Sequence, residues 1–492
     1  MNATPETQPD PRRWYALVLL CAAQFMVVLD ASIVNVALPS IKTDLGFSQS
    51  SLQWVVSAYT LAFGGFLLLG GRAADLLGRR RLFVGGLVLF SIASLAGGLA
   101  QSEGWLIAAR SVQGLGAAII SPAALAIVTT TFREGGERNK ALGIWGAIAG
   151  AGGAVGVLLG GVLTDTLGWE WVLFVNFPIG VLAALAAPRY VRESRMDRAG
   201  RHFDVLGAVS VTVGLVVLVY ALVKTGDNGW GSASTIVLLA VAVAMIAAFV
   251  VIEARSRSPL VPLGIFRNRT VTSANAIGLL VGASLFAMFY FISLYLQQVL
   301  GYSPLKTGVA YLPLAVGIIV SAGLASALVE RVGVKPTLIA GLGLVVAGLM
   351  LFTRIDTNGA YVSDVLIPSV VVAFGLGLSF VPMTIAAVSG VRDSEAGLAS
   401  GLINTSQQVG GALGLAILST VASSRTNDVM AAARGARDAL PHALTEGFQN
   451  AFAVGAVFAA VGIVLAVALL RGREVAAREA AEALAGAPPE AA

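Results

Sequence analysis

The stretch WYALVLLCAAQFMVVLDASIVNVALP, residues 14–39, decides the fold class of this chain. It is almost entirely apolar and carries one charged side chain, Asp30. A helix needs about 20 apolar residues to cross a bilayer, and it satisfies its backbone hydrogen bonds internally. Two arginines precede the stretch and no small-residue cleavage site follows a short apolar core, so we expect a retained membrane helix rather than a signal peptide.

The whole chain has the composition of a membrane protein. Of its 492 residues, 57% are hydrophobic and only 12% are charged, about half the charged share of soluble domains. The 57 glycines favour helices over a barrel, because small residues let membrane helices approach closely. Apolar runs begin near residues 15, 52, 82, 104, 140, 169, 205, 232, 270, 306, 335, 362, 398 and 447. We therefore predict an all-α integral membrane protein with fourteen transmembrane helices.

Missing residue types exclude several function classes. Cys21 is the only cysteine, and the two histidines, His202 and His442, lie in polar connecting segments, so we expect neither a metal nor a cofactor. No G-x-x-x-x-G-K-[ST] phosphate loop occurs, so we expect no ATP. No nucleophile, base and orienting group converge, so the chain is predicted not to be an enzyme. The net charge of +5 reports membrane topology rather than nucleic-acid binding.

The basic residues predict the orientation in the membrane. With the N-terminus in the cytoplasm, about 24 of the 32 Lys and Arg residues fall in cytoplasmic segments, as the positive-inside rule requires. An even number of spans then places both termini in the cytoplasm. Arginine far outnumbers lysine, a bias of GC-rich bacterial genomes, so we expect a bacterial inner or plasma membrane. The outer segment of residues 422–446 is expected to be a solvated loop.

The chain also repeats itself. Residues recur at a shift of 255 or 258 positions: Asp75, Gly78, Arg80, Glu137, Gly143, Gly153 and Gly156 match Glu330, Gly333, Lys335, Glu395, Gly401, Gly411 and Gly414. Chance matches between Gly-rich helices are the alternative to two homologous halves. We predict a cytoplasmic tail (1–14), a six-helix bundle (15–190), a connecting region (191–269) with two inserted helices near 205–224 and 232–252, a second six-helix bundle (270–470) and a cytoplasmic tail (471–492).

Two charged residues lie inside apolar runs, Asp30 in the first and Arg110 in the fourth. Burial favours a neutral acid and a nearby cation favours the carboxylate, so an acid between these effects can load and release a proton. A buried arginine needs a partner. We therefore predict that Asp30 and Arg110 form one coupled unit. The alternatives are a structural hydrogen bond or a hydrated helix end.

The turn between the second and third runs reads GRAADLLGRRR, residues 71–81. Its acid lies near the start of the next helix, where the helix dipole favours negative charge, and its basic residues can pair across helices. We predict that this turn locks a gate, and topological anchoring by the arginines is the alternative. The gate residues are Gly71, Arg72, Asp75, Gly78, Arg79 and Arg80.

The fifth run is rich in glycine. Its glycines are Gly146, Gly150, Gly152, Gly153, Gly156, Gly160 and Gly161. Small residues four apart let a helix pack closely and slide or bend against a neighbour. Packing without any role in coupling is the alternative.

In order along the chain, these motifs resemble the major facilitator superfamily, and within it the fourteen-span drug:proton antiporters of the EmrB/QacA type. Residues 29–39 (LDASIVNVALP) resemble the first-span motif, residues 71–81 the superfamily's loop motif, and residues 110–116 its fourth-span motif. The fifth-span glycines are similar to the antiporter motif, although Val157 stands where proline is common. Glu330 and Pro336 mark a degenerate second-half copy of the loop.

The resemblance implies a major facilitator fold of six, two inserted and six helices, with a central cavity between the halves. Interhelical hydrogen bonding is the alternative role for each polar candidate, and core packing or lipid contact for Tyr290. The cavity candidates are Gln24, Asn35, Tyr59, Gln113, Tyr290, Asn404, Gln407 and Gln408.

The expected function is a proton-coupled multidrug efflux antiporter that exports hydrophobic or cationic drug-like compounds by alternating access. Its expected partners are these small molecules, protons and the lipid bilayer, and the proton gradient is its energy source. Asp30 would carry the proton and Arg110 would tune it. A dedicated exporter of one antibiotic, metabolite or lipid is the first alternative, and a non-transporting membrane receptor or scaffold is the second.

Overall fold

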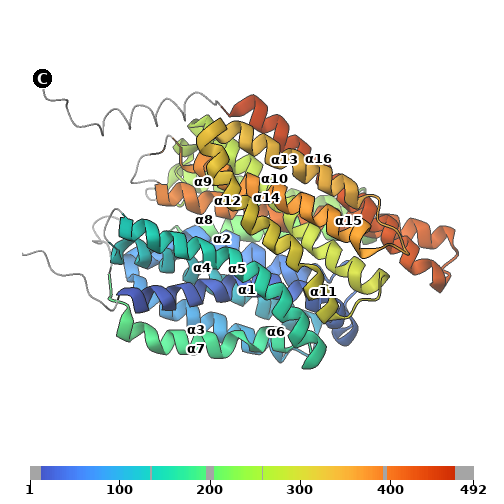
Figure 1. Cartoon of the computed structure of the whole chain (residues 1–492), viewed down its shortest axis with the longest axis horizontal. Helices are drawn as coiled ribbons and strands as arrows, with labels where there is room; N and C mark the ends of the chain where they lie inside the picture. Colours follow the sequence, from blue (N-terminus) through green and yellow to red (C-terminus); the bar gives the residue numbers. More distant parts are fainter. Residues whose placement is uncertain are drawn as a thin grey trace, which may run out of the picture.

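The computed structural model describes residues 13–132, 136–194, 204–256, 259–389, 391 and 396–470. Every regular element in these ranges is a helix, and most run along the long axis of the molecule (Figure 1). Within the described residues, 12 helical segments are long and apolar enough to cross a membrane. The protein is therefore an all-helical, multi-pass membrane protein.

The helices follow one another with short connections. The first half holds α1 (Arg13–Leu45), α2 (Trp54–Leu77), α3 (Arg79–Gly98), α4 (Glu103–Thr131), α5 (Gly136–Thr166), α6 (Trp171–Phe174) and α7 (Asn176–Tyr190). Next come α8 (Val205–Asn228), α9 (Ala233–Arg255) and the turn η1 (Leu263–Arg267). The second half holds α10 (Arg269–Leu294), η2 (Tyr295–Val299), α11 (Pro304–Ala310), α12 (Leu312–Val332), α13 (Val334–Phe352), η3 (Tyr361–Leu366), α14 (Ile367–Val388), α15 (Ala396–Ala432), η5 (Arg437–Ala439) and α16 (Leu440–Leu469).

Small polar residues determine where several helices begin. The side chains of Ser102, Asp204 and Ser232 accept hydrogen bonds from the backbone N–H three residues on, in the first turns of α4, α8 and α9. Asn268 and Ser303 cap α10 and α11 in the same manner. These caps satisfy backbone donors that have no partner within the helix. The helices accordingly begin close to the starts of the apolar runs.

The segment 422–446 is mostly helical, so the expected solvated loop was wrong. α15 continues to Ala432, and α16 already begins at Leu440. Thr426 Oγ1 donates to the Ala443 carbonyl at 3.2 Å, and Arg425 Nη2 lies 2.5 Å from Glu446 Oε2. A helix carries its own hydrogen bonds and need not end where its apolar residues end.

The two halves of the chain pack their helices in the same pairs. In the first half α1 packs on α5, α2 on α4, and α3 on α4 and α7; in the second, α10 packs on α15, α12 on α14, and α13 on α14 and α16. The matching turns contain Gly78 at φ 114° and Gly333 at φ 90°, which glycine adopts readily. Figure 1 shows the halves as two bundles side by side.

α8 and α9 form a helical hairpin at the junction of the two bundles. α8 contacts α2 of the first half and α15 of the second. Leu61, Leu215 and Ala412, one from each of these helices, belong to a single buried cluster. In contrast, only 11% of the most apolar 18-residue stretch of α9 is buried. α8 therefore contacts both halves, and α9 presents most of its apolar surface to the surroundings.

Glycines allow the closest helix crossings. A Cβ at Gly70 of α2 would overlap the Ala118 carbonyl of α4, and one at Gly114 of α4 would overlap the Tyr59 carbonyl of α2. In a bilayer, close van der Waals packing of this kind is a main force between helices. The α2–α4 pair thus depends on residues without a side chain.

We expect Gly70→Ala to lower the free energy of unfolding by about 1–3 kcal/mol, because the added methyl group overpacks the α2–α4 crossing. Thermal unfolding of the detergent-solubilised protein measures this as a lower midpoint. Gly85→Ala is the matched control, since a methyl group there meets nothing within 4 Å. Equal midpoints for the two variants would contradict the packing role of Gly70.

Candidate functional site

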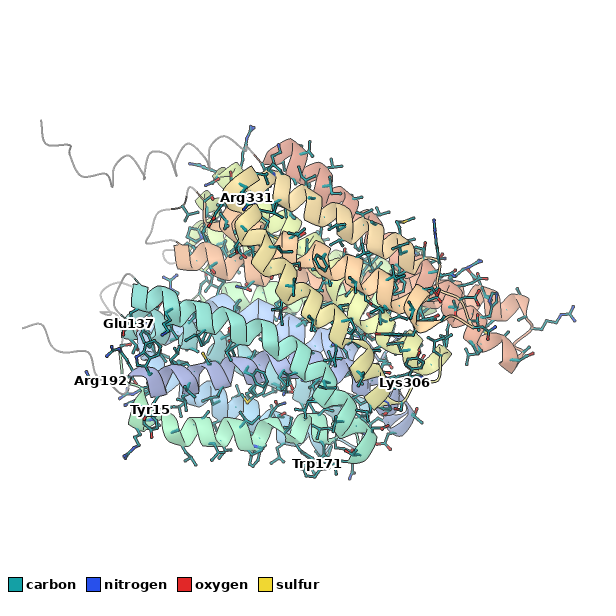
Figure 2. All side chains as sticks on the ribbon, in the orientation of Figure 1. Tyr15, Glu137, Trp171, Arg192, Lys306 and Arg331 are labelled. Carbon is teal, nitrogen blue, oxygen red and sulfur yellow. The ribbon has the colours of Figure 1, made fainter. Side chains whose placement is uncertain are left out.

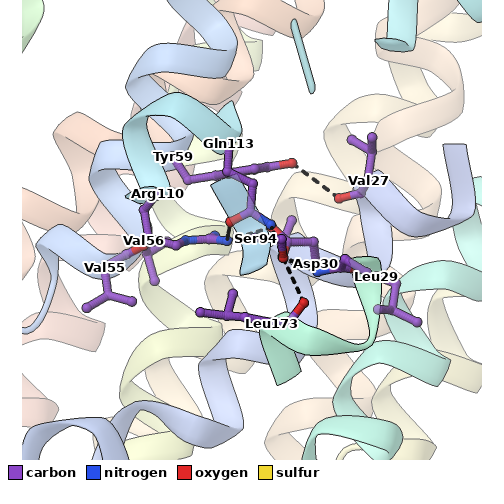
Figure 3. Close-up of polar contacts among 12 residues, drawn as sticks. Val27, Leu29, Asp30, Val55, Val56, Tyr59, Ser94, Arg110, Gln113 and Leu173 are labelled. Carbon is purple, nitrogen blue, oxygen red and sulfur yellow. Dashed lines mark hydrogen bonds and ion pairs between the residues drawn. The ribbon is translucent and has the colours of Figure 1, made fainter. Parts of the chain in front are cut away.

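Asp30 lies near the middle of α1, inside the first bundle, and its side chain is 0% exposed. The groups that bond it come from α4 and α7, and α2 and α3 supply groups that contact these partners (Figure 3). A charge removed from water in this way needs opposite charge and hydrogen bonds close by.

Three side-chain nitrogens donate to the Asp30 carboxylate. Arg110 Nη1 lies 2.6 Å from Oδ2, Gln113 Nε2 lies 2.7 Å from Oδ1, and Asn176 Nδ2 lies 2.8 Å from the same Oδ1. Hydrogen bonds to an ionised acceptor are about twice as strong as neutral ones. In each hydrogen bond between the Asp30 carboxylate and a described side chain, the carboxylate is the acceptor.

Arg110 is held from several sides. Its Nη1 also donates to Gln113 Oε1 at 2.8 Å, and its Nε donates to the Val55 carbonyl of α2 at 3.1 Å. Its guanidinium carbon lies 4.4 Å from the centroid of the Tyr59 ring, within cation–π range. The structure therefore brings four residues singled out from the sequence, Asp30, Tyr59, Arg110 and Gln113, into one group.

Two further members of this group, Ser94 and Asn176, were not predicted from the sequence. Ser94 Oγ accepts from Gln113 Nε2 at 3.0 Å and from Asn176 Nδ2 at 3.1 Å, and it donates to the Leu173 carbonyl at 2.8 Å. Both residues are 0% exposed. Both are uncharged, so a buried charge in the sequence does not mark them. The available signal was that Asn176 is an amide within the sixth apolar run.

We call Asp30, Ser94, Arg110, Gln113 and Asn176 the Asp30 cluster. Among the ion pairs of the described residues, Asp30–Arg110 is the one in which both side chains are buried, at 0% and 1% exposure. Removing one partner of such a pair costs about 3–5 kcal/mol, because an uncompensated buried charge remains. The loss of either partner would therefore destabilise the bundle.

The turn of residues 71–81, which is predicted to lock a gate, is held by an ion pair within the turn and by hydrogen bonds to Glu193. Arg79 Nη2 lies 2.7 Å from Asp75 Oδ1, so the acid pairs within the turn. The backbone N–H groups of Arg80 and Arg81 donate to the Glu193 carboxylate at 3.1 and 3.2 Å. Glu193, which the sequence analysis did not single out, therefore caps the start of α3, where the helix dipole favours an anion.

The same turn contacts two other segments. Arg72 Nη1 donates to the Pro259 carbonyl, in the connection that follows α9, at 2.8 Å. A Cβ at Gly71 would lie 3.3 Å from Pro122 of α4, and one at Gly78 would lie 2.8 Å from the capping Glu193. The turn is thus tied to the connection that follows α9 as well as to its own bundle.

The glycines of α5 place this helix against α1 beside Asp30. A Cβ at Gly152 would lie 3.0 Å from Val28, one at Gly156 would lie 2.8 Å from the Leu29 carbonyl, and one at Gly160 would lie 2.5 Å from the Ile33 carbonyl. These three glycines are four residues apart, so they form one face of α5. Gly153 has open space around it. Gly146 and Gly150 lie outside the residues whose side-chain positions are described.

Gly161 of α5 faces the other half of the protein instead. A Cβ there would lie 2.6 Å from the Pro304 carbonyl of α11. In return, a Cβ at Gly308 of α11 would lie 2.9 Å from the Val157 carbonyl of α5. The two backbones therefore come nearly into contact between the halves at the end of the bundle where α11 begins.

The remaining cavity candidates lie apart from the Asp30 cluster. Asn35 Nδ2 donates to the Ala31 and Ser32 carbonyls of its own helix at 3.1 and 3.3 Å, which is a structural role. Asn404 is exposed and likewise bonds its own helix. Gln24, Gln407 and Gln408 are half-buried, and Gln408 packs on Gly64 of α2.

Tyr290 borders a separate small hollow of about 10 Å³, the size of one water molecule, which is lined by second-half residues and by Gln49. Its ring is 1% exposed, and its hydroxyl has no hydrogen-bond partner in the described residues. Ser419 borders the same hollow, and its hydroxyl is also without a partner there. Phe291 and Phe448 form an apolar wall, with ring centroids 5.5 Å apart. Tyr290 is thus placed in a hollow, but away from Asp30.

The described residues hold no candidate metal centre. No three His, Cys, Asp or Glu side chains in them lie close enough together to bind a metal ion. Cys21 is buried in α1, and His442 lies 3.0 Å from Glu446 near the start of α16.

Comparison with known proteins gives the family. The Major Facilitator Superfamily model matches residues 20–415. The chain is 44% identical over 465 residues to the puromycin resistance protein pur8 of Streptomyces alboniger, over 94% of this chain and 91% of that protein. It is also 44% identical over 429 residues to the cephamycin export protein CmcT of Amycolatopsis lactamdurans, over 87% of this chain and 88% of that protein.

A solved structure agrees with this result at the level of the fold. It is a bacterial homolog of the human lysosomal transporter Spinster in an inward-facing, unoccupied conformation. It matches with a TM-score of 0.66 and 18% identity, over 93% of this chain and 96% of that chain. The chain therefore belongs to the Major Facilitator Superfamily, a family of membrane transporters.

Proposed function

We propose that this protein is a proton-coupled efflux antiporter that exports hydrophobic or cationic drug-like compounds by alternating access. The observation that carries the proposal is the fully buried Asp30–Arg110 pair, with N–O distance 2.6 Å, inside a bundle of this family. A proton that crosses 100 mV supplies about 2.3 kcal/mol. An acid that alternates between a paired and a protonated state can tie this energy to a movement of the protein.

α1 offers a direct route from the proton site to the other half. The Asn35 carbonyl accepts from Ser293 Oγ of α10 at 2.7 Å, and the Val36 carbonyl accepts from Gln297 Nε2 at 2.9 Å. These contacts lie between one and two helical turns beyond Asp30. We propose that protonation loosens the hold of Arg110 on α1 and thereby weakens its contacts with the second half.

In this mechanism, α5 and the turn after α2 serve as gate elements. Gly161 and Gly308 allow the backbones of α5 and α11 to close one end of the passage. Because α11 meets the carbonyl of Val157 rather than its side chain, the absence of proline at this position leaves that contact possible. The turn holding Arg72 and Asp75 would stabilise one gate state through its bonds to Pro259 and Arg79.

We also propose fourteen spans in a six, two and six arrangement, with both termini in the cytoplasm. The 12 candidate spans leave out α5 and α15, which have 31 and 37 residues and pack on α1 and α10. The common packing pairs of the two halves support the six-helix units. In Figure 2, Glu137, Arg192 and Arg331 lie at one end of the molecule, and Trp171 and Lys306 lie towards the other.

We expect cysteine labelling to report this topology. In a Cys21→Ser background, a cysteine at Asn358, between α13 and η3, reacts with an impermeant maleimide added to whole cells. A cysteine at Arg331, at the end of α12, reacts only after the membrane is opened. Labelling of Arg331→Cys in intact cells would contradict the proposed orientation.

We expect Asp30→Asn to abolish efflux driven by a pH gradient in everted vesicles, because asparagine cannot release a proton at this site. The variant leaves Arg110 without its carboxylate and should lower the free energy of unfolding by about 3–5 kcal/mol. Rates are therefore divided by the amount of folded protein. Asp44→Asn is the matched control on the same helix, since Asp44 bonds Trp169 Nε1 at 2.9 Å and not the cluster.

The double variant Asp30→Asn with Arg110→Gln separates stability from coupling. It removes the unpaired cation as well as the acid, so we expect a folded but uncoupled protein. If either variant keeps the parental rate of gradient-driven efflux, proton coupling at Asp30 is refuted.

The names of the relatives bear on the substrate. One is named for puromycin resistance and the other for cephamycin export, so each name gives a single antibiotic. This favours a dedicated antibiotic exporter as the second candidate function.

We expect cells that express the protein to resist several unrelated dyes, biocides and antibiotics, with lower accumulation of each. Cells expressing Asp30→Asn are the reference. Resistance to one compound alone would identify a dedicated exporter. No ligand-dependent proton flux in vesicles with any compound would instead favour the receptor or scaffold alternative.

A further inference from the structure

The surroundings of Asp30 are built for a carboxylate and hold no obvious place for the neutral acid. Arg110 of α4 is the charged group facing it, and Tyr59 of α2 is the other titratable group, with its ring over the guanidinium. α3 and α7 contribute the uncharged Ser94 and Asn176. A protonated carboxyl has an O–H that needs an acceptor, whereas the nitrogens around Asp30 present N–H groups.

One acceptor atom of the cluster has no hydrogen-bond partner among the described residues. Gln113 Oε1 already accepts from Arg110 Nη1 at 2.8 Å, and Ser94 Oγ accepts two hydrogen bonds while donating to the Leu173 carbonyl. In contrast, Asn176 Oδ1 is buried and has no hydrogen-bond partner among the described residues. Buried polar atoms without partners are uncommon and call for an explanation.

We propose that Asn176 is the proton-sensing partner of Asp30 and turns its side-chain amide when Asp30 takes up a proton. This rests on the proposed proton coupling at Asp30. A half-turn of the terminal torsion, which is broad and roughly two-fold, exchanges Nδ2 and Oδ1. The proton from the aqueous phase stays bonded to Asp30 Oδ1, and this O–H donates a hydrogen bond to Asn176 Oδ1. Oδ2 keeps only a weaker, neutral hydrogen bond from Arg110.

The position of Asn176 gives this turn a structural consequence. Asn176 is the first residue of α7, directly after the short helix α6. In the ionised state its amide bonds both Asp30 of α1 and Ser94 of α3 through Nδ2. In the neutral state Oδ1 faces them, so the donated bond to Ser94 is lost. Asn176 is thus a positioning residue whose bond to α3 depends on the charge of Asp30.

Infrared difference spectroscopy between high and low pH tests this inference on the purified full chain in lipid nanodiscs. The carboxyl C=O band of Asp30 is identified by its loss in Asp30→Asn. We expect Asn176→Leu, which keeps the side-chain size and removes the amide, to shift this band to higher wavenumber, because the O–H loses its acceptor. Asn275→Leu is the matched control, since Asn275 bonds Val271 and Ser406 in the second half.

The outcomes separate the two proposals. An Asp30 band that Asn176→Leu leaves in place overturns the sensing role and leaves proton coupling intact. The absence of any Asp30 band in the parent across the pH range overturns both, because the inference requires protonation of this residue. If Asn176→Leu does not yield folded protein, Asn176→Val carries the same readout and the same criterion.

Discussion

The first bundle depends on keeping one carboxylate charged in a place without water. Asp30 of α1 is compensated by Arg110 and the amide of Gln113, both on α4, and by the amide of Asn176 on α7. The desolvation cost of such a pair is recovered only with good geometry and further hydrogen bonds. Hydrogen bonds to Asp30 therefore fix the relative positions of α1, α4 and α7, and the loss of one would leave a buried charge without compensation. A change in the charge of Asp30 acts on all three helices together.

Glycine makes this polar centre possible. In lipid there is little hydrophobic force between helices, so their association relies on close packing and on interhelical hydrogen bonds. Gly114 brings α4 against the Tyr59 carbonyl of α2, and Gly156 brings α5 against the Leu29 carbonyl of α1, one residue before Asp30. The short side chains of Ser94 and Asn176 also meet where two backbones are close, since a Cβ at Gly180 of α7 would overlap Ser91 of α3. The glycines thus set the close spacing of the helices around the buried charge pair.

The sequence predicted the elements with a strong physical signal and missed those without one. Long apolar runs predict membrane helices because backbone groups must be satisfied in lipid, and Asp30 and Arg110 were paired because they were the opposite charges assigned to apolar runs. Asn176 and Ser94 carry no charge, so nothing in their composition marks their depth. Glu193 caps α3 from a connecting segment more than 100 positions away, which no local pattern reports. The end of α15 was misplaced because polarity indicates the membrane boundary and not the end of a helix.

The two halves share their packing and differ in what they bury. α10 repeats α1, and the matching glycine contacts of α5 and α15 align Asp30 of α1 with Ser284 of α10. There, Gly411 of α15 lies against the Phe286 ring, and Gly414 lies against Ala283, just as Gly156 lies against Leu29 in the first half. The helix pair and its glycines are kept while the carboxylate is replaced by the buried hydroxyl of Ser284, which donates to the Gly455 carbonyl at 3.0 Å. Under the proposed proton coupling, protonation of Asp30 changes the charge of the first bundle at a position where the second bundle has the uncharged Ser284. Two bundles with the same packing then respond differently to one proton, which is the condition for turning protonation into a movement of one half against the other.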